Sequence, residues 1–235
     1  MAKHMISERL AVERRYVRAA DIARDLDDPA ALDGYILTSR ARDALVRLSS
    51  GLSSGSTQRA FRVTGPYGSG KSSFGLLLAR LCQSNDPRAQ AIASHVPVEH
   101  AFASLAPLVV VGRRASLARS LLSGVAAKAH ARFGEADTQA LRCENILASE
   151  GGTRIDTEDV LNELVELSER LKAAEGAGLL LLVDEMGRFL EFAATNQASE
   201  DPALFQQIAE RASGSAHENF AVVAFLHHRF DDYLG

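Results

Sequence analysis

Short apolar runs alternate with longer amphipathic segments along most of the chain. Four of the runs predict β-strands, at residues 60–64, 107–111, 179–183 and 220–226. The third run, in GLLLLVDE, shows no alternation of apolar and polar residues. Such a run is typical of a parallel strand that helices cover on both faces. The pattern therefore predicts a sheet with buried central strands.

The amphipathic segments carry apolar residues at the spacing of an α-helix. They predict helices at residues 8–25, 38–49, 71–83, 115–132, 156–174 and 203–213, with a less regular helical piece between 132 and 156. Helices come first, and strands then alternate with helices. This order predicts an α/β fold of three layers, α/β/α, built on a mostly parallel sheet.

The same pattern divides the chain into two parts. Residues 1–55 form a helical N-terminal segment, and residues 56–235 form the core, with the connector GLSSGSTQ between them. The helical stretch between the second and third strands, about residues 113–178, is long for one connection. We expect it to be a helical insertion, either a subdomain or a lid.

Composition narrows the class of protein. The 235 residues are 46% hydrophobic and 24% charged, a composition that is ordinary for a globular protein. The net charge of −4 gives no overall basic field that would attract nucleic acid. The basic residues near the start are interleaved with acids, which favours a solvated helix face; they are Arg9, Arg14, Arg15 and Arg18. Cys82 and Cys143 lie in predicted helices, so we expect buried thiols.

The chain shows no membrane or export signal. No apolar run reaches the 18 or so residues of a membrane span, and the opening residues are polar and charged. We therefore expect a cytoplasmic protein that does not enter a membrane.

The stretch GPYGSGKSS, between the first predicted strand and a predicted helix, carries the strongest chemical motif. It fits the pattern G-x-x-x-x-G-K-[ST] and contains one of only four lysines, against 22 arginines. Glycines permit a tight loop whose backbone N–H groups surround a phosphate at a helix N-terminus. Lys71 would reach the phosphates, and the Ser72 hydroxyl would bind Mg²⁺. The predicted phosphate-binding residues are Gly65, Pro66, Tyr67, Gly68, Ser69, Gly70, Lys71, Ser72 and Ser73.

Two acids end the third predicted strand. The carboxyl ends of parallel strands are where open α/β sheets bind ligands. Asp184 would hold Mg²⁺, and Glu185 would orient and deprotonate an attacking water. In the alternative reading these acids cap the strand or pair with Arg188.

Polar residues also follow the last predicted strand. His227 would contact the terminal phosphate or the attacking water. The run HHRFDD allows two alternatives, a metal site of His227, His228, Asp231 and Asp232, or surface residues that end a strand.

Other positions are weaker candidates. An arginine often stabilises a transferring phosphoryl group, and Arg188, Arg211 and Arg229 are candidates for that role. Tyr35 and Ile36 would flank an adenine ring, or else pack as part of a connector.

Taken together, GPYGSGKS, LLLLVDE and the polar end of NFAVVAFLHH resemble the Walker A, Walker B and sensor 1 motifs of AAA+/STAND P-loop ATPases, in the ASCE class. The shorter stretches GYILT, DEMGRFLE and LHHRFDDY resemble large bacterial ATP-binding proteins of anti-phage defence and DNA-processing systems, such as the BREX ATPases. The resemblance implies ATP and Mg²⁺ as ligands, with Lys71 on the phosphates, Ser72 and Asp184 at the metal, Glu185 as catalytic base and His227 as sensor.

The resemblance also implies a fifth core strand and a helical lid, which do not follow before Gly235. We therefore expect a fragment, or a chain that a second copy or a partner protein completes at an open sheet edge beside the strand 60–64. The leading hypothesis is an ATPase module that couples nucleotide state to a larger complex. A nucleotide-binding switch that barely hydrolyses ATP and a small-molecule phosphotransferase are the alternatives.

Overall fold

A computed structural model covers all 235 residues of the protein. The residues that it describes are 20–53, 56–83, 86–98, 102, 104–149, 155–196, 201–214 and 219–227. None of the helices in this part of the chain is both long and apolar enough to cross a membrane.

Four strands form one all-parallel sheet, with the order β1-β4-β3-β2. The strands are β1 Ala60–Thr64, β2 Leu105–Val111, β3 Gly178–Asp184 and β4 Phe220–Leu226. Every residue of the two central strands is buried. The structure thus confirms the four predicted strands and the parallel sheet. Among the described strands β1 lies at an edge, beside β4, where we expected an open edge.

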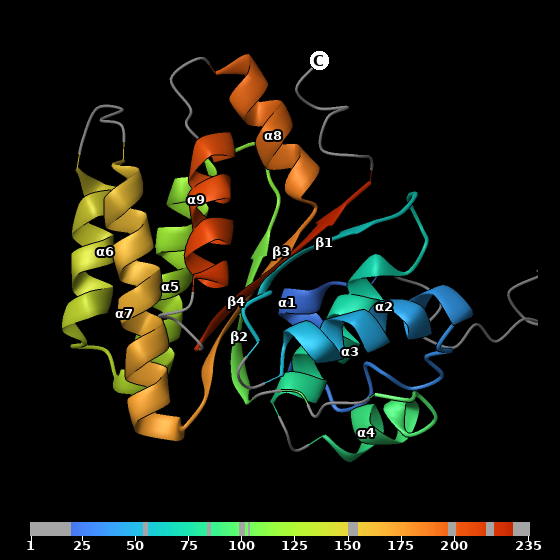
Figure 1. Ribbon diagram of the computed structural model, residues 1–235. Coiled ribbons are helices and arrows are strands. Elements are labelled where there is room, and N and C mark those ends of the chain that lie inside the picture. Colours follow the sequence, from blue (N-terminus) through green and yellow to red (C-terminus); the bar gives the residue numbers. More distant parts are fainter. Residues whose placement is uncertain are drawn as a thin grey trace, which may run out of the picture.

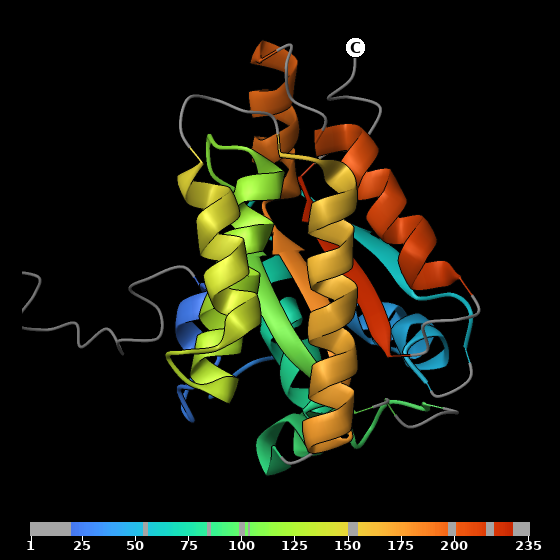
Figure 2. The same cartoon turned by 90° about the vertical axis from the view of Figure 1, so that its left-hand side faces the viewer.

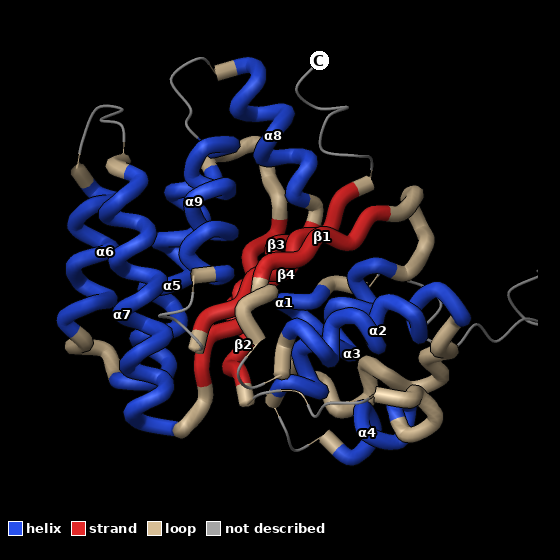
Figure 3. Tube along the Cα trace, viewed as in Figure 1, coloured by secondary structure: helices blue, strands red, loops and turns tan. Residues whose placement is uncertain are grey.

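Helices cover both faces of the sheet (Figure 1; Figure 3, strands in red). Helices α5, α7 and α9 pack on one face, α6 packs on α5, and α7 crosses in front of the sheet in Figure 2. Helices α1, α2 and α3 pack on the other face, with α4 against α3. Their bounds are α1 Ile22–Asp25, α2 Ser39–Gly51, α3 Lys71–Cys82, α4 Pro87–Ala93, α5 Leu117–Phe133, α6 Thr138–Ala148, α7 Thr157–Glu175, α8 Met186–Thr195 and α9 Asp201–Ser213.

Side chains of the buried strand β3 lie in two hydrophobic cores, one on each face of the sheet. Along β3, Leu179, Leu181 and Val183 lie in the core under α5 and α7, whereas Leu180 and Leu182 lie in the core under α2 and α3. Side chains of a strand alternate between its faces, so an uninterrupted leucine run fills both cores.

The N-terminal segment packs into this second core. Ile22 of α1 and Leu45 and Leu48 of α2 are buried there with Phe74 of α3. Of the helix predicted over 8–25, only α1 lies within the described residues, and the basic residues from Arg9 to Arg18 lie outside them.

Side-chain caps explain where most helices begin. The side chains of Thr38, Asp86, Ser116, Asp137 and Asp156 each accept a hydrogen bond from a backbone N–H in the first turn of the following helix. These bonds satisfy donors that the helix itself leaves unpaired. Helices α3 and α8 follow residues with left-handed backbone, Gly70 and Glu185, and neither has a side-chain cap.

Two helices were not predicted. Helix α4 is a short helix that Asp86 caps and Pro87 begins. Helix α8 starts directly after Glu185, in a stretch that we had considered only for its acids. Its buried residues include Met186, Phe189 and Leu190, which have the spacing of one helix face.

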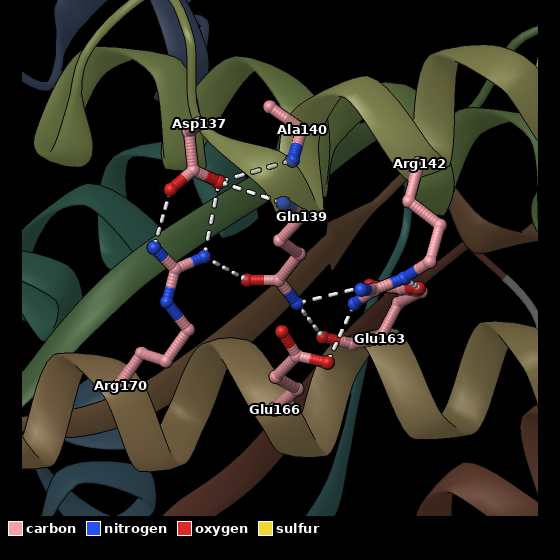
Figure 4. Close-up of polar contacts among 7 residues, drawn as sticks. All are labelled: Asp137, Gln139, Ala140, Arg142, Glu163, Glu166 and Arg170. Carbon is pink, nitrogen blue, oxygen red and sulfur yellow. Dashed lines mark hydrogen bonds and ion pairs between the residues drawn. The ribbon is translucent and has the colours of Figure 1, made fainter.

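A partly buried polar network joins α6 to α7 (Figure 4). We call it the α6–α7 network; it consists of Asp137, Gln139, Arg142, Glu163, Glu166 and Arg170. Arg170 pairs with Asp137, and Arg142 pairs with Glu163 and Glu166. The Gln139 side chain links the two halves, since its oxygen accepts from Arg170 and its nitrogen donates to Glu163. The network fixes α6 against α7, away from the motif residues.

Candidate functional site

The glycine-rich stretch forms a loop between β1 and α3, at the carboxyl edge of the sheet. The Gly65 N–H donates to the Leu226 carbonyl of β4 at 3.2 Å, and the Ser69 N–H donates to the Pro66 carbonyl at 3.2 Å. Gly68 and Gly70 have φ of 73° and 85°, a left-handed conformation that favours glycine. The loop therefore turns sharply and delivers the chain into α3.

The space around these glycines leaves the start of α3 accessible. A Cβ added at Gly68 or Gly70 would meet no heavy atom within 4 Å, whereas a Cβ at Gly65 would lie 2.9 Å from the Ser69 Oγ. The first turn of α3 also has no side-chain cap. Uncapped N–H groups at a helix N-terminus carry the positive end of the helix dipole and attract anions.

Lys71, the first residue of α3, is partly buried at this loop. Its Nζ donates to the Gly65 carbonyl at 2.7 Å and to the Pro66 carbonyl at 3.0 Å, and it lies 3.0 Å from the His227 Nδ1. Burial lowers the pKa of the ammonium, and the charges of Asp184 and Glu185 offset part of that effect. All three hydrogen-bond partners are neutral acceptors, so no carboxylate in direct contact neutralises this cation.

Ser72 and Asp184 lie side by side at the ends of α3 and β3. The Ser72 hydroxyl donates to the Asp184 Oδ2 at 2.8 Å, and the Glu185 N–H donates to Oδ1 at 2.9 Å. Asp184 is 4% exposed. The structure thus brings together the two predicted metal ligands, which are 112 positions apart in sequence.

The turn after Asp184 depends on a residue that the sequence analysis missed. The Gly112 N–H donates to the Asp184 carbonyl at 2.7 Å, and a Cβ at position 112 would lie 2.0 Å from the Glu185 carbonyl oxygen. Only glycine fits this close approach. A glycine directly after a predicted strand was the available sequence signal.

Glu185 has an unusual backbone. Its φ of 49° and ψ of 40° are left-handed, and it is the one residue other than glycine with positive φ in the described part of the chain. A non-glycine residue in this region costs about 1–3 kcal/mol, and such residues cluster at functional sites. The Glu185 carboxylate pairs with the Arg188 Nε at 2.5 Å, as the alternative reading of this acid predicted.

His227 lies between the lysine and an aromatic ring. Its ring stacks on the Tyr67 ring, with centroids 4.9 Å apart and an interplanar angle of 29°. Tyr67 is 78% exposed. The stack joins the glycine-rich loop to the end of β4, a contact that the sequence did not predict. We call Tyr67, Lys71, Ser72, Asp184, Glu185 and His227 the loop cluster.

The weaker candidates lie elsewhere or outside the described residues. Arg211 pairs with Glu158 of α7. Tyr35 packs with Leu32 and Leu76, where burial raises its pKa to about 12, while Ile36 is 80% exposed. His228, Arg229, Asp231 and Asp232 fall outside the described residues.

Two further features bear on possible chemistry, metal-binding groups and the two cysteines. Within the described ranges, no group of three or more histidine, cysteine or acidic side chains is placed to hold a metal ion. Both cysteines are buried, as expected.

No protein-family model matches the chain, and a search of curated proteins finds no match.

Proposed function

We propose that the protein binds a nucleoside triphosphate, ATP with Mg²⁺, at the loop of residues 65–73 and hydrolyses it. The observation that supports the proposal is the environment of the Lys71 ammonium. A partly buried ammonium, held by neutral acceptors beside an uncapped helix N-terminus, leaves positive charge that a phosphate chain would neutralise. A lysine is also the side chain suited to reach phosphates as a point charge.

The oxygen groups beside Lys71 fit Mg²⁺. This ion prefers hard oxygen ligands, and it is usually held by one or two carboxylates together with substrate phosphates. The Ser72 hydroxyl and the buried Asp184 carboxylate, 2.8 Å apart, provide such a set. These two residues would hold Mg²⁺, which when bound neutralises charge on the phosphates.

Glu185 would act as the general base. Its carboxylate would accept a proton from water as the water oxygen attacks the γ-phosphorus. The bond from the γ-phosphorus to the β–γ bridging oxygen then breaks, and ADP and inorganic phosphate leave. The positive φ of Glu185 and its bond to Arg188 fix the direction of its side chain.

The ion pair also favours a second candidate function. A Glu185 carboxylate that remains bound to Arg188 would not be positioned to accept a proton from water, and the protein would then be a nucleotide-binding switch with negligible turnover. In either case we propose that nucleotide state is passed to a larger assembly, with a second copy or a partner at the β1 edge. This part of the proposal rests on the resemblance of the motifs.

A ligand series tests the binding proposal. Isothermal titration of adenosine, AMP, ADP and ATP with Mg²⁺ should show affinity rising with each phosphate, because the contacts are to the phosphate chain. Inorganic pyrophosphate should compete with ATP. Equal affinity for adenosine and ATP would show that the loop does not bind phosphate.

A further inference from the structure

The Lys71 ammonium has three N–H donors and no more. Gly65, Pro66 and His227 supply three acceptors, at 2.7, 3.0 and 3.0 Å. Each donor therefore already has a partner, and a phosphate oxygen would have to displace one of them. Two of the acceptors belong to the loop that would surround the phosphate. The third, His227, comes from β4, 156 positions along the chain.

The contact with Lys71 defines the protonation of the His227 ring. An ammonium only donates, so the His227 Nδ1 must offer its lone pair, and the ring proton must lie on Nε2. The neutral Nε2–H tautomer is therefore the form that fits this contact. A ring that turned or changed tautomer would lose the bond to Lys71.

The Tyr67 ring restricts that movement. Aromatic rings with centroids 4.5–7 Å apart attract one another, and the Tyr67–His227 pair falls in this range at 4.9 Å. Tyr67 is 78% exposed, so its ring contributes little to the hydrophobic core. Its position within the glycine-rich loop means that this loop holds both Lys71 and the ring that orients His227.

We propose that Tyr67 is a positioning residue that holds His227 on Lys71, and that a bound phosphate chain replaces His227 there. This inference rests on the proposed function. A charge-assisted bond from an ammonium to a phosphate is stronger than one to a neutral nitrogen, so the exchange is favourable. The His227 ring then loses its hydrogen bond to Lys71, so occupancy of the loop changes a contact at the end of β4.

The ligand-free protein provides the first test. The tautomer of each histidine can be read from its ring ¹⁵N and ¹³C chemical shifts, and the variant His227→Gln assigns the His227 signals. Wild type and Tyr67→Phe should show His227 as a single Nε2–H tautomer, since both keep the stacked ring. Tyr67→Ala should show a mixture. An unchanged tautomer in Tyr67→Ala, or loss of the single tautomer in Tyr67→Phe, would overturn the role of Tyr67.

The exchange is tested with Mg²⁺–pyrophosphate, which has no base to stack on Tyr67. In wild type, saturation should change the His227 shifts from those of the single tautomer. Tyr67→Ala should bind pyrophosphate about fivefold more tightly, because one hydrogen bond of about 1 kcal/mol no longer has to be broken. Tyr67→Phe should match wild type, and Leu141→Ala controls for loss of an exposed apolar side chain.

The outcomes separate this inference from the proposed function. Unchanged His227 shifts in saturated wild type, or equal pyrophosphate affinity in Tyr67→Ala and wild type, would overturn the exchange while leaving phosphate binding intact. No binding of pyrophosphate or ATP by wild type would overturn both the proposed function and the exchange. The tautomer measurement on the ligand-free protein would still decide whether Tyr67 positions His227.

Discussion

Between α6 and α7, Arg142 and Arg170 each form an ion pair with a carboxylate. In the loop cluster, by contrast, Lys71 forms hydrogen bonds with two carbonyl oxygens and a histidine nitrogen. Asp184 of the loop cluster likewise accepts from a hydroxyl and a backbone N–H rather than from a cation. Both clusters are built from charged side chains near buried strands and helices. In the α6–α7 network opposite charges neutralise each other. In the loop cluster Lys71 and Asp184 form no ion pair with each other, and Glu185 pairs with Arg188.

We propose that this difference separates a structural network from a binding site. Charges that are paired and hydrogen-bonded hold helices together and have little capacity left for a ligand. A cation and a carboxylate that neutral groups hold apart can each gain a stronger partner, an anion for Lys71 and a metal ion for Asp184. The variants below should therefore affect stability in one cluster and binding or turnover in the other.

The largest effect is expected on turnover. Glu185→Gln should lower ATP hydrolysis by about 10²- to 10⁴-fold, the usual contribution of a general base, while ATP binding is kept. Glu166→Gln in the α6–α7 network is the matched control and should hydrolyse ATP at the wild-type rate. Phosphate release measured for wild type, Glu185→Gln and Glu166→Gln tests the role of Glu185 as the base. Continued turnover in Glu185→Gln would remove Glu185 as the base, and negligible turnover in wild type would favour the switch.

The next largest effect is on stability. Arg142→Met leaves the Glu163 carboxylate, 5% exposed, without its ion-pair partner. Glu163 is buried but the Arg142 side chain is 46% exposed, so breaking this pair costs less than breaking a fully buried one, about 1–2 kcal/mol, which should lower Tm by about 2–8 °C. Adding Glu163→Gln should recover at least half of the loss, because it removes the unpaired charge and keeps an oxygen for Gln139. Nucleotide affinity should not change, and a weaker affinity in Arg142→Met would contradict the separation of the two clusters.

A pair of glycines sharpens the comparison. Gly70 and Gly176 both have positive φ, and a Cβ at either would meet no heavy atom within 4 Å. Alanine at either position should cost about 1–2 kcal/mol of stability through backbone strain alone. Gly70→Ala should also weaken ATP binding, because its Cβ would enter the space in front of the loop, and Gly176→Ala should not. Thermal unfolding with and without Mg²⁺–ATP measures both effects, and equal loss of binding in the two variants would contradict a local role for Gly70.

The smallest expected effect is a change with pH in the contribution of Asp137 to the free energy of unfolding. The hydrogen bond and ion pair with Arg170 lower the pKa of Asp137 to about 2, below the value of about 3.9 in an unfolded chain. The folded-state pKa is depressed, so the contribution is complete above about pH 4 and is lost as the pH falls through 2. Urea unfolding of wild type and Asp137→Asn should show a stability difference that shrinks over this range. A difference that stays constant down to pH 2 would contradict the ion pair.

The sequence predicted the strands well because each of the four apolar runs matches a strand, and the two central strands are buried throughout. It also predicted a tight loop between β1 and α3, because glycines at 68 and 70 permit the positive φ that the structure shows there. The closeness of Ser72 and Asp184 followed from the parallel sheet, because both lie at its carboxyl edge.

The missed features depend on three-dimensional placement. Helix α8 had a readable pattern at Met186, Phe189 and Leu190, and recognising it would have placed Arg188 one turn from Glu185. The stack of Tyr67 on His227 has no sequence signal, because it depends on how the loop turns toward β4. Nor does helical periodicity say which polar residues of α6 will face α7.

The most direct test of the central claim is a thermal-shift titration with Mg²⁺–ATP of wild type, Lys71→Ala and Lys172→Ala. Lys172 is a matched lysine, since its Nζ also donates to a backbone carbonyl, that of Gly176, but lies on α7. At a ligand concentration 100-fold above the wild-type Kd, binding adds about 2.7 kcal/mol, or roughly 5–10 °C in Tm. We expect this shift in wild type and Lys172→Ala and little or none in Lys71→Ala. Equal shifts in all three proteins, or no shift in folded wild type, would contradict a phosphate site at Lys71.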